Sequence, residues 1–140
     1  MIVLKDEGLY CPEGDFFIDP LLPCKNAVIT HAHADHARPG MKNYICTPET
    51  SEIMKLRISN DLLIKEVEYN NEIQINSVKI TFIPAGHVLG SSQIKIDNGS
   101  EVTIITGDYK RAIDPTCKAF EVHECDTFVT EATFASPNFK

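Results

Sequence analysis

The chain has 140 residues, enough for one domain, and its 43% hydrophobic and 24% charged residues are ordinary for a globular protein. No apolar run approaches the ~20 residues that a membrane-spanning helix needs, and charge begins at Lys5, too early for a signal peptide, so we expect a cytoplasmic protein. The net charge of −7 argues against nucleic-acid binding by bulk electrostatics, and any basic surface would have to be local.

The pattern along the chain alternates short apolar segments with turns, which predicts many strands and few helices. In the first part we expect strands over 15–19, 26–30 and 43–47, then a helix over 48–58 that Thr47 can cap and that begins at Pro48. The remainder is rich in β-structure, with Asn76-Ser77 and the turn 97–100 as hairpin signals. The strands expected there cover 64–69, 72–76, 78–83, 93–97, 101–106 and 127–130.

The most informative motif is His31-Ala32-His33-Ala34-Asp35-His36, which follows the apolar strand 26–30. Imidazole and carboxylate groups are the ligands that zinc takes in catalytic sites. Residues two apart in an extended segment point the same way, so His31 and His33 can face one metal. Asp35 and His36 are adjacent, and both can reach a second metal if the chain turns there.

Three further candidate residues also follow predicted strands. His87 lies between two glycines after the strand 78–83, Asp108 follows the strand 101–106, and Glu131 follows the strand 127–130. A carboxylate such as Asp108 can bridge two cations with its two oxygens. A rigid scaffold can build a site from ligands on several strand ends when these ends converge on one rim. Two metal ions so placed would polarise a phosphoryl oxygen and generate hydroxide at neutral pH.

These motifs resemble the metallo-β-lactamase superfamily. The six-residue motif resembles its second motif, Asp19 in Phe17-Ile18-Asp19-Pro20 resembles its first, and the segment 84–91 resembles the β-CASP nucleases. The segments 10–16, 27–38 and 106–110 are similar to the bacterial DNA ligase-associated exonucleases, a group also described as mRNA 3′-end processing factor-like. The resemblance implies an α/β fold, the N-terminal portion of an αββα sandwich with mostly antiparallel strands.

The resemblance also implies a role for each motif residue. His31, His33 and His87 would hold one metal ion, Asp35 and His36 the other, and Asp108 would bridge the two. Asp19 would support the site from a strand end, and Glu131 resembles the acidic motif that opens the β-CASP region. Asp35 and Glu131 are therefore the candidate catalytic carboxylates. Arg38 and Lys110 are candidate phosphate contacts, with solvated surface charge as the competing interpretation.

The function implied is metal-dependent hydrolysis of nucleic-acid phosphodiester bonds, with DNA 3′-end exonucleolysis in repair as the favoured form. Two divalent ions, zinc in preference to manganese, are the expected cofactors. Nucleic acid, DNA in preference to RNA, is the expected partner, and the family implies a DNA ligase and a helicase. The alternatives are a small-molecule hydrolase such as a glyoxalase II-like thioesterase, and an inactive metal-binding fragment or partner-binding half-domain.

The chain matches only the beginning of the family's pattern. The family supplies a further zinc-ligand histidine after the β-CASP insertion, and no such segment follows Glu131 here. We therefore expect residues 1–140 to be the N-terminal part of a metallo-β-lactamase-like domain, without the β-CASP region and the C-terminal return.

Overall fold

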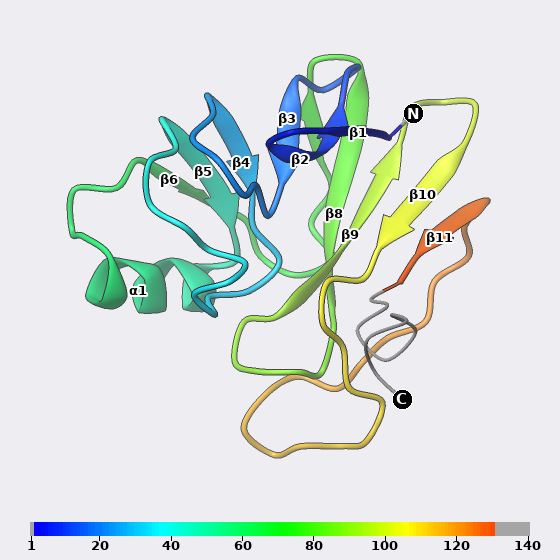
Figure 1. Cartoon of the computed structure of the whole chain (residues 1–140). Helices are drawn as coiled ribbons and strands as arrows, with labels where there is room; N and C mark the ends of the chain where they lie inside the picture. Colours follow the sequence, from blue (N-terminus) through cyan, green and yellow to red (C-terminus); the bar gives the residue numbers. More distant parts are fainter. Residues whose placement is uncertain (1, 131–140) are drawn as a thin grey trace, which may run out of the picture.

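The structure, a computed structural model, describes residues 2–130. In this part of the chain, two β-sheets pack face to face, and one helix covers the outer side of the first sheet (Figure 1). Residues 2–130 hold no helix with the length and apolar character needed to cross a bilayer.

The first sheet has six strands that lie side by side in chain order. Neighbours from β1 to β3 are antiparallel, whereas neighbours from β3 to β6 are parallel. Parallel pairing requires a crossover between strands, and α1 supplies it between β5 and β6. The strands are β1 (Val3–Lys5), β2 (Gly8–Cys11), β3 (Phe16–Ile18), β4 (Asn26–Val28), β5 (Asn43–Cys46) and β6 (Ile64–Glu66).

The second sheet has five strands in the order β11-β10-β9-β8-β7. Strands β7 to β10 form an antiparallel meander, and β11 pairs with β10 in parallel. The Asn76 and Gly99 turns of its two hairpins both have positive φ, at 52° and 91°. The strands are β7 (Ile73–Ile75), β8 (Val78–Pro84), β9 (Ser92–Asp97), β10 (Val102–Ile105) and β11 (Thr127–Val129).

Strand direction places several C-terminal strand ends at one rim. Strands β3, β4 and β5 are parallel, so their C-terminal ends share an edge of the first sheet. Strands β8 and β10 both run antiparallel to β9, so they also end at a common edge. The Ser92 amide donates to the Thr30 carbonyl at 2.7 Å and thereby joins the two edges.

Two apolar clusters hold these layers together. The cluster between the sheets combines Phe16 and Val28 from the first sheet with Ile80, Phe82 and Ile94 from the second, all essentially inaccessible to solvent. The other cluster lies between the first sheet and α1. Successive strand residues point to opposite faces, so Ala27 belongs to the outer cluster and its neighbour Val28 to the inner one. Burial on both faces explains why residues 27–29 form a continuous apolar run.

Helix α1 (Pro48–Arg57) begins with the signals that the sequence predicts. The Thr47 Oγ1 accepts a hydrogen bond from the Thr50 amide at 3.4 Å, and Pro48 occupies the first helical position, where no amide donor is needed. The Thr47 hydroxyl also lies 2.8 Å from the Gly90 carbonyl oxygen, to which it donates. The cap therefore joins the helix to the loop between β8 and β9.

Replacement of Thr47 by valine, which has the same shape but no hydroxyl, should lower the free energy of unfolding by about 1–2 kcal/mol. Thr47 is 1% exposed, so the Thr50 amide would lose its capping acceptor in a buried place. The Gly90 carbonyl would lose one donor and keep those of Thr50 and Ser92. Urea unfolding followed by circular dichroism measures the change. Thr81→Val, on the half-buried β8 residue Thr81, is the control, and an equal effect of both variants would contradict the assignment.

Each predicted strand and the predicted helix is present in the structure, and no predicted bound differs from the observed one by more than three residues. Two strands were not predicted, β1 and β2, and β1 is exposed along its whole length. Within residues 2–130, five strand pairs are antiparallel and four are parallel, so the antiparallel majority is slight. This part of the chain forms three of the four layers of an αββα sandwich, because its only helix lies on the first sheet.

Candidate metal centre

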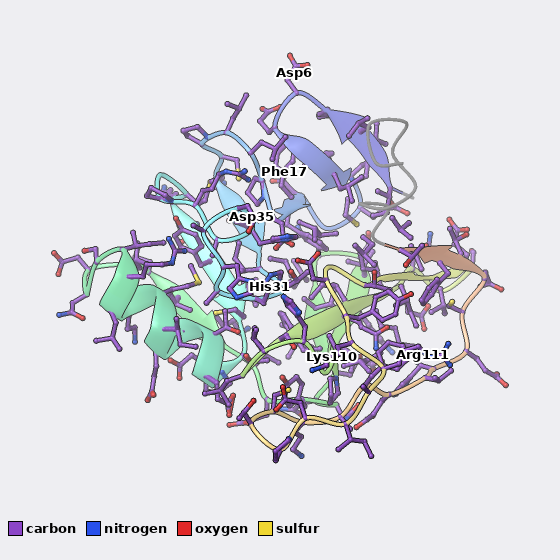
Figure 2. The ribbon with its side chains drawn as sticks, turned by 60° about the horizontal axis from the view of Figure 1, so that its bottom comes forward. Asp6, Phe17, His31, Asp35, Lys110 and Arg111 are labelled. Carbon is purple, nitrogen blue, oxygen red and sulfur yellow. The ribbon has the colours of Figure 1, made fainter. Side chains whose placement is uncertain are left out.

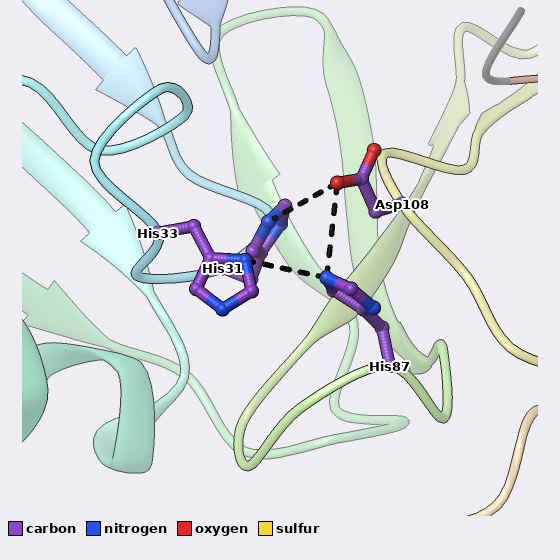
Figure 3. Close-up of side chains that lie close together, drawn as sticks. All are labelled: His31, His33, His87 and Asp108. Atoms are coloured by element: carbon purple, nitrogen blue, oxygen red, sulfur yellow. Dashed lines mark hydrogen bonds and ion pairs between the residues drawn. The ribbon is translucent and has the colours of Figure 1, made fainter. Parts of the chain in front are cut away.

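Four predicted ligands meet where the two sheet edges join (Figure 3). His31 and His33 follow β4, His87 follows β8, and Asp108 follows β10. One candidate ligand atom from each of the four lies within 4.8 Å of the others. The Asp108 Oδ2 is 3.7 Å from the Nε2 atoms of both His31 and His87. The His87 Nε2 is in turn 3.3 Å from the His33 Nδ1.

The remaining two predicted ligands lie beside this group. The His36 Nε2 is 3.4 Å from the Asp108 Oδ2 and 3.7 Å from the Asp35 Oδ2. The chain does turn here, because the amides of His36 and Ala37 both bond to the His33 carbonyl, at 3.0 and 2.8 Å. Asp108 is thus the carboxylate that both histidine sets share. The Asp35 side chain is 73% exposed, whereas those of His36, His87 and Asp108 are 20–26% exposed.

Asp19 supports the centre through hydrogen bonds. It follows β3 with a φ of 46°, and its carboxylate accepts from the Thr30 amide at 2.8 Å and from the Thr30 hydroxyl at 2.6 Å. The same carboxylate lies 2.7 Å from the His36 Nδ1. Although Asp19 also lies within 4.8 Å of ligand atoms on His31 and His36, these bonds already occupy its oxygens. Its geometry therefore suits support better than ligation.

These bonds select the tautomers of two histidines. An ionised Asp19 can only accept, so the His36 Nδ1 must donate and its Nε2 lone pair faces Asp108. The Thr30 hydroxyl donates to Asp19, so it accepts from the His31 Nδ1 at 2.9 Å. The His31 Nε2 lone pair is likewise left to face Asp108. Outer partners of this kind orient metal-binding imidazoles and make them more basic.

Asp19→Asn should weaken divalent-metal binding about 10- to 100-fold. An asparagine keeps the size and tolerates the positive φ, but it has a single acceptor oxygen, whereas Asp19 accepts from the Thr30 amide with one oxygen and faces the Thr30 hydroxyl and the His36 Nδ1 with the other. Its NH2 group would therefore oppose the Thr30 amide or donate to the His36 Nδ1 and select the wrong tautomer. Competition with a chromophoric chelator measures the affinity. Asp15→Asn is the matched control, since Asp15 also has a positive φ, 55°, and bonds to Tyr10 instead. Equal loss in both variants would argue against the supporting role.

The buried His31 ring shows that the site suits a cation. Its side chain is wholly inaccessible, and the buried Nε2 has no hydrogen-bond partner. A buried polar atom without a partner is costly unless something occupies its lone pair. Burial lowers the pKa of His31 to about 3, so the ring is neutral and able to ligate at neutral pH. Three imidazoles and a carboxylate form a donor set that zinc accepts.

In metal-free protein, the histidines should make stability depend on pH with opposing signs. His31 protonates near pH 6.5 when unfolded but only near pH 3 when folded, so acidification below about pH 6.5 favours unfolding. Burial opposes the charged form of His36 as well, but the Asp19 bond and nearby carboxylates outweigh it and raise the pKa. His36 therefore contributes stability below its unfolded pKa, and this contribution is lost as the pH rises through the folded value.

Urea unfolding in chelator between about pH 8 and pH 5 tests this expectation. Wild-type protein should lose stability as the pH falls. His36→Gln should lose it more steeply, because the opposing contribution is removed. A shallower profile for His36→Gln would show that the signs are wrong.

Two glycines let the ligand loops approach closely. Gly107 has a φ of 57°, and a Cβ there would lie 2.7 Å from the Thr30 Oγ1. Gly86 has a φ of 72°, and a Cβ there would lie 2.5 Å from the Lys110 carbonyl oxygen. Only glycine satisfies both the backbone angle and the space. The Ser91 Oγ then fixes the His87 loop by accepting from the His87 and Val88 amides at 3.1 and 3.2 Å.

The structure does not bring every predicted site residue into this cluster. Asp35 and His31 lie on the loop after β4, whereas Lys110 lies on the loop after β10, where its Nζ is 3.7 Å from the Asp114 carboxylate (Figure 2). The Arg38 Nη1 is buried and bonds to no protein group. Glu131 falls outside the residues that the structure describes.

A cavity of about 310 Å³ opens beside the Asp108 side of the cluster. Its walls are mainly apolar and come from the β1–β2 hairpin and the ends of β3, β10 and β11. Asp35, His36 and Asp108 line it as well, so a substrate group seated there would lie next to the metal ligands. Sequence reasoning missed this feature because β1 and β2 carry no strong strand signal.

No family model matches the chain. Comparison with curated proteins gives relatives whose names describe proteins that act on nucleic acid. A probable DNA ligase from Opitutus terrae is 25% identical over 94% of this chain and 13% of its own. Transcription termination factor FttA from Methanosarcina mazei is 29% identical over 93% of this chain and 25% of its own. Endoribonuclease YSH1 from Kluyveromyces lactis is 32% identical over 52% of this chain and 10% of its own. The chain thus spans a quarter or less of these relatives' lengths.

Comparison with solved structures identifies the fold. The metallo-β-lactamase fold protein YhfI from Bacillus subtilis superposes with a TM-score of 0.51 at 14% identity, over 71% of this chain and 52% of its own. This chain has the metallo-β-lactamase fold. CmlA, a diiron β-hydroxylase from Streptomyces venezuelae, matches with a TM-score of 0.60 at 16% identity, over 82% of this chain and 30% of its own. The resemblance to metallo-β-lactamase-fold nucleases inferred from the motifs is therefore confirmed by both comparisons.

Sequence reasoning identified Asp19 as a support of the site but overlooked two other supporting residues, Thr30 and Arg57. Thr30 precedes the histidine motif and bonds to both Asp19 and His31. Its position directly before His31 was a usable signal, because a hydroxyl there can reach the adjacent ring. Arg57 was seen only as part of a helix, yet it bonds to the ligand loop.

Proposed function

We propose that the protein is a metal-dependent hydrolase that cleaves phosphodiester bonds of nucleic acid. Within this class, we propose that it is a DNA 3′-end exonuclease. The observation that carries the proposal is the position of the Asp108 Oδ2, within 3.7 Å of ring nitrogens from His31, His36 and His87. One carboxylate shared between two histidine groups suits a pair of ions. The relatives named as a DNA ligase and an endoribonuclease support nucleic acid as the substrate class.

The donor set suits two divalent ions, with zinc favoured and manganese as the alternative. His31, His33 and His87 would hold one ion, Asp35 and His36 would hold the other, and Asp108 would touch both. Two such ions supply Lewis-acid polarisation of the phosphodiester and a nucleophile at neutral pH.

The chain's own residues would orient the substrate and handle protons. The carboxylate of Asp35 is exposed and adjacent to the centre, so it can accept a proton from a solvent molecule there. The mainly apolar cavity beside Asp108 offers room for one part of the substrate. Lys110 and Arg38 are proposed phosphate contacts, and Glu131 is the proposed second catalytic carboxylate. Because the net charge is −7, local cations must provide the attraction for phosphate.

The first experiment combines metal analysis with cleavage assays on the full protein. Purified protein is stripped with chelator, reloaded with zinc, manganese or iron, and analysed for bound metal. Iron is included because CmlA, which shares the fold, is a diiron β-hydroxylase. We expect two ions per chain and metal-dependent cleavage. Protein that binds fewer than two ions and cleaves no phosphodiester would contradict the proposal.

The second experiment separates the substrate classes. Single- and double-stranded DNA and RNA, labelled at either end, distinguish exonucleolysis from endonucleolysis, and a glutathione thioester tests for small-molecule hydrolysis. We expect stepwise loss of nucleotides from the DNA 3′ end. Faster cleavage of RNA would replace the DNA assignment, and thioester hydrolysis alone would replace the nuclease assignment.

A further inference from the structure

Arg57, the last residue of α1, reaches the turn that carries three of the predicted ligands. Its Nε donates to the Ala32 carbonyl oxygen at 3.1 Å, and its Nη2 donates to the Ala37 carbonyl oxygen. These two carbonyls bracket residues 33–36. One guanidinium therefore spans the turn that holds His33, Asp35 and His36.

The carbonyls that Arg57 contacts need a donor. The segment 33–37 forms a single turn, with the His36 and Ala37 amides bonded to the His33 carbonyl. The Ala37 carbonyl at the end of such a turn has no partner inside it, and the Ala32 carbonyl lies directly before the turn. Ala32 and Ala37 are 5% and 0% exposed and pack in the same cluster as Met54 of α1. A planar guanidinium presents two donors in a fixed geometry, which an ammonium does not.

The opposite end of α1 holds the other ligand loop. The hydroxyls of Thr47 and Thr50 lie 2.8 and 3.0 Å from the Gly90 carbonyl oxygen, in the loop that carries His87. A ten-residue helix thus contacts the His87 loop at its first turn and the histidine turn at its last. Because a short helix is stiff along its axis, each contact constrains the spacing of the two ligand loops.

We propose that Arg57 is a positioning residue for the metal centre. Its two donors set the separation of the Ala32 and Ala37 carbonyls, and this separation sets the directions of His33, Asp35 and His36. The inference rests on the proposed function for the role of those three residues as ligands. It adds a residue outside the motif, on a different element, that the ligands need in order to converge.

The test uses the full protein and three variants. Arg57→Gln removes the bidentate contact, Arg57→Lys keeps the charge with a single donor group, and Lys55→Gln is the control. Lys55 lies on the same helix and makes only an exposed ion pair with Glu66 at 3.8 Å. For each variant, zinc affinity is measured by chelator competition, the cobalt-substituted centre by its visible absorption, and metal-free stability by urea unfolding.

We expect Arg57→Gln to bind zinc about 10- to 100-fold more weakly and to shift the cobalt spectrum, with Arg57→Lys intermediate and Lys55→Gln unchanged. Variants that lose stability but keep wild-type affinity and spectrum would overturn the positioning role alone. Wild-type protein that binds no divalent ion would overturn the proposed function and this inference with it. If Arg57→Gln does not fold, wild-type affinity and spectrum in Arg57→Lys would overturn the role.

Discussion

Asp108→Ala should abolish hydrolysis, with a loss of about 10³-fold or more in rate. Its Oδ2 is the atom nearest to both histidine groups, at 3.7 Å from the His31 Nε2 and 3.4 Å from the His36 Nε2. Without this carboxylate, two cations held a few ångströms apart would lack the negative charge between them, so at least one should be lost. Elemental analysis and the cleavage assay, carried out on the same preparation, measure both effects.

Asp6→Ala provides the control for this experiment. Asp6 is an exposed carboxylate in the turn between β1 and β2, and it does not belong to the groups of residues that could hold a metal ion. It should keep wild-type metal content and rate. If Asp108→Ala retained two ions and normal activity, the shared-carboxylate assignment would be wrong, whatever the overall reaction.

Phe82→Ala should lower the free energy of unfolding by about 3–5 kcal/mol. Phe82 is completely buried at the centre of β8, in the cluster that joins the two sheets, so its loss leaves a cavity that neither sheet can fill alone. This is a large part of the about 5–15 kcal/mol that stabilises a typical domain. Urea unfolding with chelator present measures the change.

Lys79→Ala, on the exposed side of the same strand, should change stability by less than about 0.5 kcal/mol. Bound zinc should restore part of the Phe82→Ala loss, because a ligand that binds only the folded state stabilises it by mass action. A Phe82→Ala loss no larger than that of Lys79→Ala would show that the sheets do not depend on this contact.

Local patterns in the sequence predict most elements of the fold but not how they pair. The strands at 26–30 and 78–83 and the helix at 48–58 have strong signals, and the structure contains β4, β8 and α1 there. β1 and β2 were missed because Lys5, Asp6 and Glu7 interrupt a short hairpin whose first strand is exposed along its whole length. The parallel direction of β3 to β6 follows from connections in space, which periodicity does not record.

The candidate ligands and the supporting Asp19 could be picked out from the sequence, whereas the supporting Thr30 and Arg57 could not. Histidines and carboxylates are rare enough in one cluster that their types and spacing indicate metal chemistry, and the structure brings His31, His33, His87 and Asp108 together. Thr30 and Arg57 are common residue types whose roles depend on which backbone or side-chain atom lies opposite. Those neighbours are set by tertiary packing, so no local pattern identifies them.

The meeting of two sheet edges has a consequence for how the molecule responds to its ions. His31 follows a strand of one sheet, and His87 and Asp108 follow strands of the other. Within residues 2–130, one backbone amide-to-carbonyl bond, from Ser92 to Thr30, links the two edges at this rim. An ion held there would act as a removable cross-link between segments distant in the sequence, with the entropic effect of closing a long loop. Chelation would then loosen the seam between the layers before it unfolds either layer, and amide exchange should quicken first at the rim.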